Sequence, residues 1–146
     1  MTQFENIPVA SILPQRPPFV FVDRLLHYDE HETLTSYTVP QEGIFVEDGK
    51  LRTAGLVEHM AQSGAARVGY ISKYILHVPV RIGYIGQVRG LTVLRNPSCG
   101  ETLTTKVVLI QDMFGITLTD VEVRCAGELI ASASVKTALS DKEIEE

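Results

Sequence analysis

The pattern of apolar and polar positions divides the chain into one helix and a series of strands. Helical spacing dominates residues 55–70, where small residues recur every three or four positions. We expect a helix over about residues 54–75, with Thr53 as its N-cap. The small residues predict close wrapping by a sheet, because each glycine inside a helix costs about 1 kcal/mol relative to alanine.

Strand patterns fill most of the remaining chain. Residues 19–28 and 33–39 predict a hairpin before the helix, and residues 41–53 predict a loop. Four further strands are predicted after the helix, over residues 81–94, 101–111, 116–125 and 128–137. In the third of these the apolar phase slips at Thr119-Asp120, which predicts a β-bulge there.

This order of elements predicts an α+β fold, with one strongly curved antiparallel sheet around one central helix. The 146 residues are expected to form a single domain, residues 1–146. A proline-rich segment, residues 1–18, precedes the first strand and contains a predicted helical turn at residues 8–13, and an acidic tail follows at 141–146. A sheet wrapped around one helix leaves an edge or face unpaired, so a dimer is expected.

Composition and charge narrow the class of protein. A net charge of −5 without a basic patch argues against nucleic-acid binding. No apolar run reaches 18 residues, so no membrane span is predicted, and the N-terminus lacks the features of a signal peptide. Cys99 and Cys125 then predict reduced thiols in a cytoplasmic protein, without a disulfide or metal site. No cofactor is predicted.

Glu58 is the main candidate for chemistry. It lies too deep in the helix to serve as a first-turn charge, and Gln62 follows one turn later on the same face. Such an acid is either a core group bonded by Gln62 or a working carboxyl. We favour the working carboxyl, because buried carboxylates are costly.

Two motifs carry a resemblance to a known family. The first is Ile12-Leu-Pro-Gln-Arg-Pro-Pro-Phe-Val-Phe-Val-Asp-Arg24, and the second is Glu58-His-Met-Ala-Gln62. With these motifs the chain resembles the 3-hydroxyacyl-acyl carrier protein dehydratases of the hotdog fold, over nearly its whole length. The resemblance implies a dimer whose interface forms a tunnel for an acyl chain carried on a phosphopantetheine arm.

The chain departs from this family where the base is expected. The resemblance implies a histidine fourteen residues before the helix acid, where this chain has Ile44 between Gly43 and Phe45. The Pro-Gly expected before the helix is Thr53-Ala54, and Gln15 replaces a histidine of the N-terminal segment. Such departures are similar to the dehydratase-like proteins of aryl-polyene pathways.

The resemblance implies that Glu58 is the catalytic acid or water-positioning group, and that backbone amides near residues 53–55 stabilise a developing enolate. The implied substrate-binding residues are Gln62, Gly43, Ile44, Phe45, Thr53 and Gly55. No other histidine is a clear replacement base. His59 points about 100° away from Glu58. His27 and His31 are expected at the surface, and His77 is expected near the C-terminus of the helix, where a cation is favoured.

Three functions stay open at this point. The chain is a 3-hydroxyacyl-thioester dehydratase with a relocated base, a non-catalytic subunit that completes an active hotdog partner, or an acyl thioesterase that uses Glu58. Its expected partners are an acyl carrier protein or acyl-CoA, and a second hotdog subunit in a homodimer or hetero-oligomer. An acidic carrier protein needs a basic patch, for which four residues near the helix are candidates: Arg52, Arg67, Lys73 and Arg81.

Overall fold

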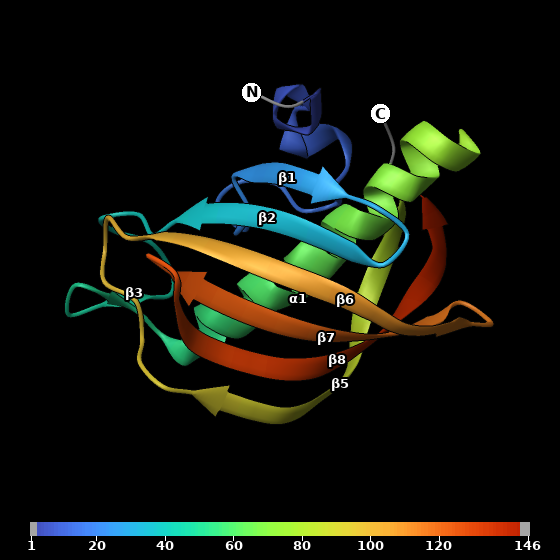
Figure 1. Ribbon diagram of the computed structural model, residues 1–146. Coiled ribbons are helices and arrows are strands. Elements are labelled where there is room, and N and C mark those ends of the chain that lie inside the picture. Colours follow the sequence, from blue (N-terminus) through green and yellow to red (C-terminus); the bar gives the residue numbers. More distant parts are fainter. Residues whose placement is uncertain (1–2, 144–146) are drawn as a thin grey trace.

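One long helix crosses a curved antiparallel sheet in the computed structural model, which describes residues 3–143 (Figure 1). The helix, α1, spans Thr53–Tyr70 and continues as a turn of π-helix, Ile71–Leu76. His77 ends it in the left-handed conformation, with φ of 55°. The predicted helix, residues 54–75, thus agrees with the observed limits to within one residue at each end. In the described residues no helix is both long and apolar enough to cross a bilayer.

The sheet has the strand order β1-β2-β6-β7-β8-β5, and each neighbouring pair is antiparallel. The strands are β1 Arg24–Tyr28, β2 Glu32–Thr38, β5 Arg81–Val93, β6 Thr102–Met113, β7 Ile116–Cys125 and β8 Glu128–Glu143. A two-stranded ribbon, β3 Val46–Glu47 and β4 Lys50–Leu51, lies inside the predicted loop. The predicted α+β architecture is confirmed.

The start of the first strand was predicted too early. Pairing begins at Arg24, and the Asp23 N–H donates to the Ser36 carbonyl of β2 just before it, whereas residues 19–21 lie along the helix. Their backbone groups bond to a helix side chain: Phe21 N–H donates to Gln62 Oε1 at 2.7 Å, and the Phe19 carbonyl accepts from Gln62 Nε2 at 2.9 Å. Because these partners replace a strand ladder, Phe21 is buried without strand pairing, whereas Phe19 remains exposed.

Two other predictions were wrong in detail. The extra residue between β6 and β7 is Ile110 on β6, since pairing steps from Leu109–Thr119 to Gln111–Leu118. β7 alternates without a slip, and its apolar Ile116 simply points outward and is exposed. At the helix start, Arg52 is the N-cap, and it makes no side-chain capping bond.

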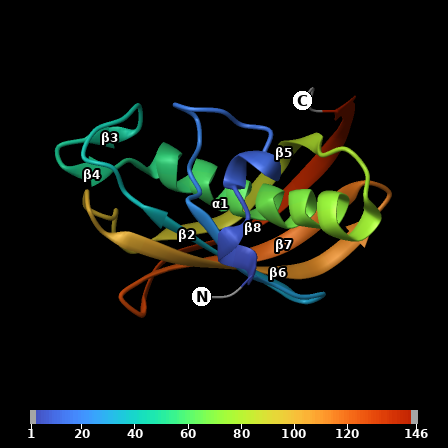
Figure 2. The same ribbon diagram turned by 90° about the horizontal axis from the view of Figure 1, so that it is seen from above.

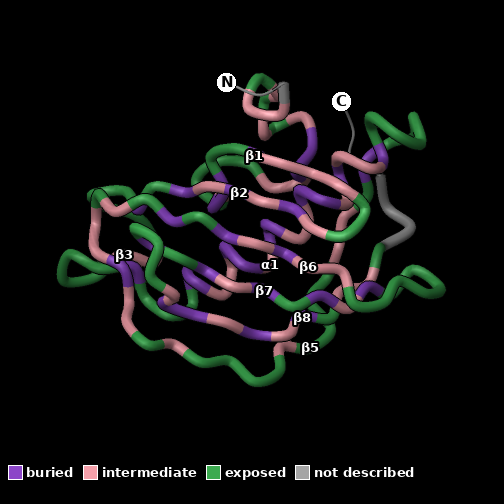
Figure 3. Tube along the Cα trace, in the orientation of Figure 1, coloured by how far each residue is buried: buried purple, intermediate pink, exposed green. Residues whose placement is uncertain are grey.

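The N-terminal segment covers the side of α1 that the sheet leaves open (Figure 2). It contains the predicted helical turn, a 3₁₀ turn at Val9–Ser11. Ile12, Leu13 and Val22 form a second core there with Ala66 of the helix. The larger core lies between the helix and the sheet, and burial along each central strand alternates accordingly (Figure 3). The helix is therefore covered from two sides.

The small residues of α1 serve three different purposes, so close wrapping by the sheet is an incomplete explanation. At Gly69 a Cβ atom would overlap the backbone of Ile12, so this glycine admits the N-terminal segment. At Gly55 a Cβ atom would collide with the side chains of Leu51 and Phe45. At Gly64, by contrast, a Cβ atom would meet nothing within 4 Å.

This contrast predicts opposite effects of the same substitution on stability. Gly64→Ala should raise the free energy of unfolding by about 0.5–1 kcal/mol, because alanine favours the helix and has room. Gly69→Ala should lower it by about 1–3 kcal/mol, because the new methyl group must displace the Ile12 backbone. Urea unfolding followed by circular dichroism measures both. Equal effects at the two positions would contradict this assignment of their roles.

Candidate active site

A groove of about 240 Å³ runs between α1 and the strands β5 and β8. The helix contributes Glu58, Ala61, Gly64, Ala65 and Val68, and the strands contribute Arg81, Gly83, Tyr84, Ile85, Thr137 and Leu139. Gln15 of the N-terminal segment completes the lining. The open space at Gly64 is part of this groove, so the small residues of this helix face keep the groove open. On the helix side of the groove, Glu58 contributes a carboxyl group and the other lining residues are small or apolar.

Gln62 holds the Glu58 carboxyl group in place. The Gln62 Nε2 group donates to Glu58 Oε1 at 2.9 Å, one helical turn away. The same amide binds the backbone of Phe19 and Phe21, as described above, and is itself buried. Gln62 is thus behind Glu58 and does not line the groove. Its three hydrogen bonds make it a positioning residue for the carboxyl group.

The other predicted substrate-binding residues cluster at the N-terminal end of α1, outside this groove. Ile44 is exposed, and Phe45 packs on the ring of Phe21 with centroids 5.4 Å apart. Gly43 lies in the same loop, and Gly55 lies beneath Leu51 and Phe45. Thr53 lines a shallow hollow, where its hydroxyl accepts a hydrogen bond from Asn96 Nδ2 at 3.2 Å. The groove and this cluster are two separate features of the helix.

Four polar groove residues were absent from the predicted site: Gln15, Arg81, Tyr84 and Thr137. Gln15 stood out in the sequence only as a replaced histidine. Its amide oxygen is buried and has no hydrogen-bond partner in the described structure, so it is free to accept one from a ligand. Arg81 and Tyr84 carry no local sequence signal, because only the position of β5 beside the helix brings them to the groove.

His59 is a structural residue, although it follows Glu58 directly. Its Nδ1 lies 2.7 Å from the Phe21 carbonyl, and its Nε2 lies 2.6 Å from Thr105 Oγ1. A carbonyl only accepts, so Nδ1 carries the proton and Nε2 accepts from the Thr105 hydroxyl. Burial lowers the pKa of His59 to about 4. The ring is neutral near pH 7 and has no free nitrogen for catalysis.

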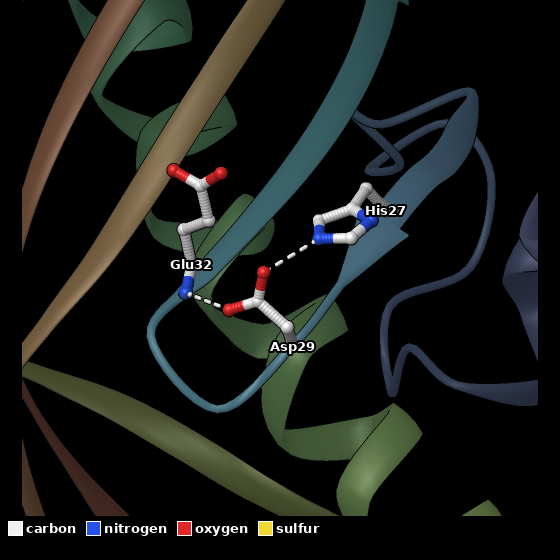
Figure 4. A group of neighbouring side chains, drawn as sticks. All are labelled: His27, Asp29 and Glu32. Atoms are coloured by element: carbon white, nitrogen blue, oxygen red, sulfur yellow. Dashed lines mark hydrogen bonds and ion pairs between the residues drawn. The ribbon is translucent and has the colours of Figure 1, made fainter.

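The remaining histidines also lie outside the groove, whose described lining contains none of the four. His27 Nε2 bonds Asp29 Oδ2 at 2.7 Å, and Asp29 Oδ1 accepts from the backbone N–H groups of His31 and Glu32 (Figure 4). The hydrogen bond from His27 lowers the pKa of Asp29 to about 2.

The group formed by His27, Asp29 and Glu32 has the donor types of a metal site, with ligand atoms within 4.8 Å of one another. Both oxygens of Asp29 are already engaged in closing the hairpin between β1 and β2. The hairpin turn therefore accounts for this cluster without an ion.

The proposed basic patch is wrong in one member. Arg67 is buried, with a relative exposure of 5%. Arg52 pairs with Glu47 at 3.5 Å near the helix N-terminus. Arg81 lines the groove, and Lys73 lies over the ring of Tyr74 near the opposite end of the helix. Arg52, at the N-terminal end of the helix, is thus separated by the length of the helix from Lys73.

Comparison with known proteins agrees with this fold. The sequence profile of the ApeP-like family, described as ApeP dehydratase, matches residues 7–146. The chain is 24% identical over 143 residues to the 3-hydroxyacyl-[acyl-carrier-protein] dehydratase FabZ of Anaeromyxobacter dehalogenans, covering 94% of this chain and 91% of that protein.

Solved structures share the architecture. A chain of the dehydratase heterocomplex ApeI:P from Xenorhabdus doucetiae superposes with a TM-score of 0.85, at 20% identity, covering 93% of each chain. The protein smu.793 from Streptococcus mutans, solved bound to acetyl CoA, gives a TM-score of 0.62 at 12% identity, covering 82% of this chain and 89% of that one. The hotdog fold expected from the sequence is confirmed.

The buried His59 predicts a specific loss of stability in mild acid. Its folded pKa of about 4 lies below the ordinary 6.5, so between these values the unfolded chain binds a proton that the folded chain does not. The free energy of unfolding should fall by roughly 3 kcal/mol from pH 6.5 to 4. His59→Gln should be less stable at pH 7 but have a flatter profile over this range. His31→Gln, at an exposed position, is the control, and an unchanged slope in His59→Gln would refute the assignment.

Filling the groove should block ligand binding while preserving the fold. Gly64→Leu places a side chain in the open space that the groove provides. We expect the Kd for an acyl thioester to rise about 10-fold or more. The leucine would exclude one or two methylene groups of the acyl chain from the groove, and their burial contributes about that much to the binding free energy. Isothermal titration with a non-hydrolysable acyl-CoA measures this, with Gly64→Ala as the control. Unchanged affinity in Gly64→Leu would exclude this groove as the acyl site.

Proposed function

Because this chain belongs to the ApeP-like dehydratase family, we propose that it supplies Glu58 and the acyl groove for dehydration of a 3-hydroxyacyl thioester, while a second hotdog subunit supplies the base. The proposal rests on the composition of the groove, which contains a positioned carboxyl group but no histidine in its described lining. The groove is also bordered by the edge strand β5. The site has one half of an acid–base pair.

The reaction needs both halves. A base removes the proton from C2, the electron pair forms the C2–C3 double bond, and the C3–O bond breaks. The leaving hydroxyl takes the proton of the Glu58 carboxyl group and departs as water, and the proton on the base returns to Glu58 through solvent. Gln62 keeps the carboxyl group aimed at the groove through this cycle. The free amide oxygen of Gln15 is available to accept a hydrogen bond from the substrate hydroxyl.

The edge strand β5 supports an oligomer in which the partner lies beside the groove. β5 pairs with β8 on one side, and no other described strand pairs with it. It is largely exposed, including the apolar residues Tyr84, Ile85 and Leu91 (Figure 3). An exposed apolar edge favours strand pairing with a second subunit. Because Arg81, Tyr84 and Ile85 of β5 also line the groove, a base on that subunit would reach the site across this edge.

The ApeI:P structure is a heterocomplex by its own description, and this supports a hetero-oligomer over a homodimer for this chain. An acyl carrier protein or coenzyme A is the proposed carrier, with Arg81 as the cation at the groove. The cytoplasmic location stays a prediction. So do substrate contacts at the six positions implied by the sequence: Gln62, Gly43, Ile44, Phe45, Thr53 and Gly55.

A turnover assay with the purified chain tests the proposal. With a 3-hydroxyacyl-CoA or the matching carrier thioester, we expect little water loss by the chain alone and formation of enoyl thioester when an ApeI-type subunit is added. In that mixture Glu58→Gln should lower the rate about 10²- to 10⁴-fold, the usual contribution of a general acid. Glu30→Gln, at an exposed hairpin position, should have no effect.

Other outcomes of the assay would contradict the proposal. Full activity of the chain alone would remove the need for a partner's base. Water loss unaffected by Glu58→Gln would remove Glu58 from the chemistry. Release of a free thiol that depends on Glu58 would instead establish the thioesterase function.

A further inference from the structure

Gln15 and Glu58 reach the groove from two different segments. The helix α1 contributes Glu58, and the N-terminal segment that covers the helix contributes Gln15. The Glu58 carboxyl group already accepts a hydrogen bond from Gln62. A ligand in the groove therefore meets an oriented carboxyl group from the helix and an amide group from the N-terminal segment.

The Gln15 amide oxygen is buried without a hydrogen-bond partner. In the described part of the chain one other buried side-chain atom shares this condition, Thr33 Oγ1, and Thr33 lies on β2 outside the groove lining. Most buried polar atoms in proteins are bonded, and an unpaired acceptor costs free energy. A ligand that brings a donor to Gln15 Oε1 recovers this cost, so the atom favours one class of ligand.

The backbone at Gln15 is fixed, whereas its amide group can turn. The Nη1 group of Arg16 donates to the carbonyl of Leu13 at 2.7 Å and to the carbonyl of Gln15 at 2.8 Å. Just before these residues, the backbone of Ile12 packs directly on Gly69 of the helix. The terminal torsion of a glutamine side chain has a broad energy minimum. The amide oxygen can therefore turn toward a donor in the groove while the segment stays in place.

The groups that occur at C3 of an acyl chain differ in what they offer to this oxygen. A hydroxyl group donates through its O–H, whereas a 3-oxo group only accepts and a methylene group does neither. A 3-oxo group beside the amide oxygen would bring two acceptors together. A site that hydrogen-bonds a substrate hydroxyl rejects analogues that lack it.

We propose that Gln15 is the specificity-determining residue of the groove, which selects acyl thioesters with a 3-hydroxyl group over their 3-oxo and saturated counterparts. The inference rests on the proposed function, because that function places C3 of the ligand beside Glu58. The substrate hydroxyl donates to Gln15 Oε1 while its oxygen accepts the proton of Glu58. The enoyl product has no donor at C3, so it is held less tightly than the substrate once water has left.

Binding of three matched ligands tests this role without turnover. They are the 3-hydroxyacyl, 3-oxoacyl and saturated acyl derivatives of coenzyme A with one chain length, in which nitrogen replaces the thioester sulfur. Isothermal titration of the whole chain, and of its complex with an ApeI-type subunit, gives the Kd of each ligand. The wild type should bind the 3-hydroxyacyl amide about 5- to 100-fold more tightly than the 3-oxoacyl amide, the usual effect of leaving a buried polar group unpaired.

Variants separate recognition of the hydroxyl group from packing. Gln15→Met keeps the length of the side chain but removes the acceptor, so the preference for the 3-hydroxyacyl amide should be lost. Gln15→Glu keeps an acceptor and should keep the preference. Gln111→Met, at an exposed position of β6, should bind all three ligands like the wild type. If Gln15→Met does not fold, the same comparison with Gln15→Ala decides.

The ratio of Kd values also separates this inference from the proposed function. A ratio unchanged in Gln15→Met, including a parallel rise of all three Kd values, would overturn the inference even where dehydration still depends on Glu58. Equal wild-type affinities, tighter binding of the 3-oxoacyl amide, or no binding by the chain and its complex would overturn it as well. A preference that depends on Gln15, in a complex that does not dehydrate, would support the inference and contradict the proposed function alone.

Discussion

The three hydrogen bonds of the Gln62 amide are the interaction on which the site depends. Two of them bind the backbone of residues 19–21 to the helix, and the third orients Glu58. One side chain thus joins the position of the N-terminal segment to the position of the candidate acid. Because the amide is buried, loss of any one partner leaves a polar group unsatisfied. The same side chain therefore both attaches residues 19–21 to the helix and orients the candidate acid.

The unusual composition of α1 follows from the two surfaces that cover it. Gly69 allows the backbone of Ile12 to reach the helix, and this contact leads the chain on to Gln15 at the groove. On the adjacent face, small residues preserve an open channel beside β5. The helix thus gives up intrinsic stability at several positions. Packing against the N-terminal segment explains this on one side, and the open groove explains it on the other.

The polar groups of the helix divide by face. Glu58 faces the groove beside the edge of the sheet, where a partner subunit has access. His59 and Ser63 face the interior, where they bond to the sheet or to the backbone of Phe21, and Arg67 is also buried. A histidine adjacent to the candidate acid in sequence is consequently far from its chemistry. Neighbouring residues on a helix point about 100° apart, so Glu58 lines the groove while His59 lies in the core.

The sequence by itself determined the α+β class, the limits of the helix within a few residues, the candidate acid and the missing histidine before it. The class and the helix limits depend on periodicity, which is a local property of the chain, whereas the missing histidine follows from the resemblance of two motifs to the hotdog dehydratases. Tertiary structure decided which face of the helix meets which surface. It placed residues 19–21 on Gln62 rather than in a strand, buried Arg67, and brought Gln15 and Arg81 to Glu58 from distant segments. Periodicity identifies residues that share a face, but the neighbour of that face is set by packing between segments far apart in the chain.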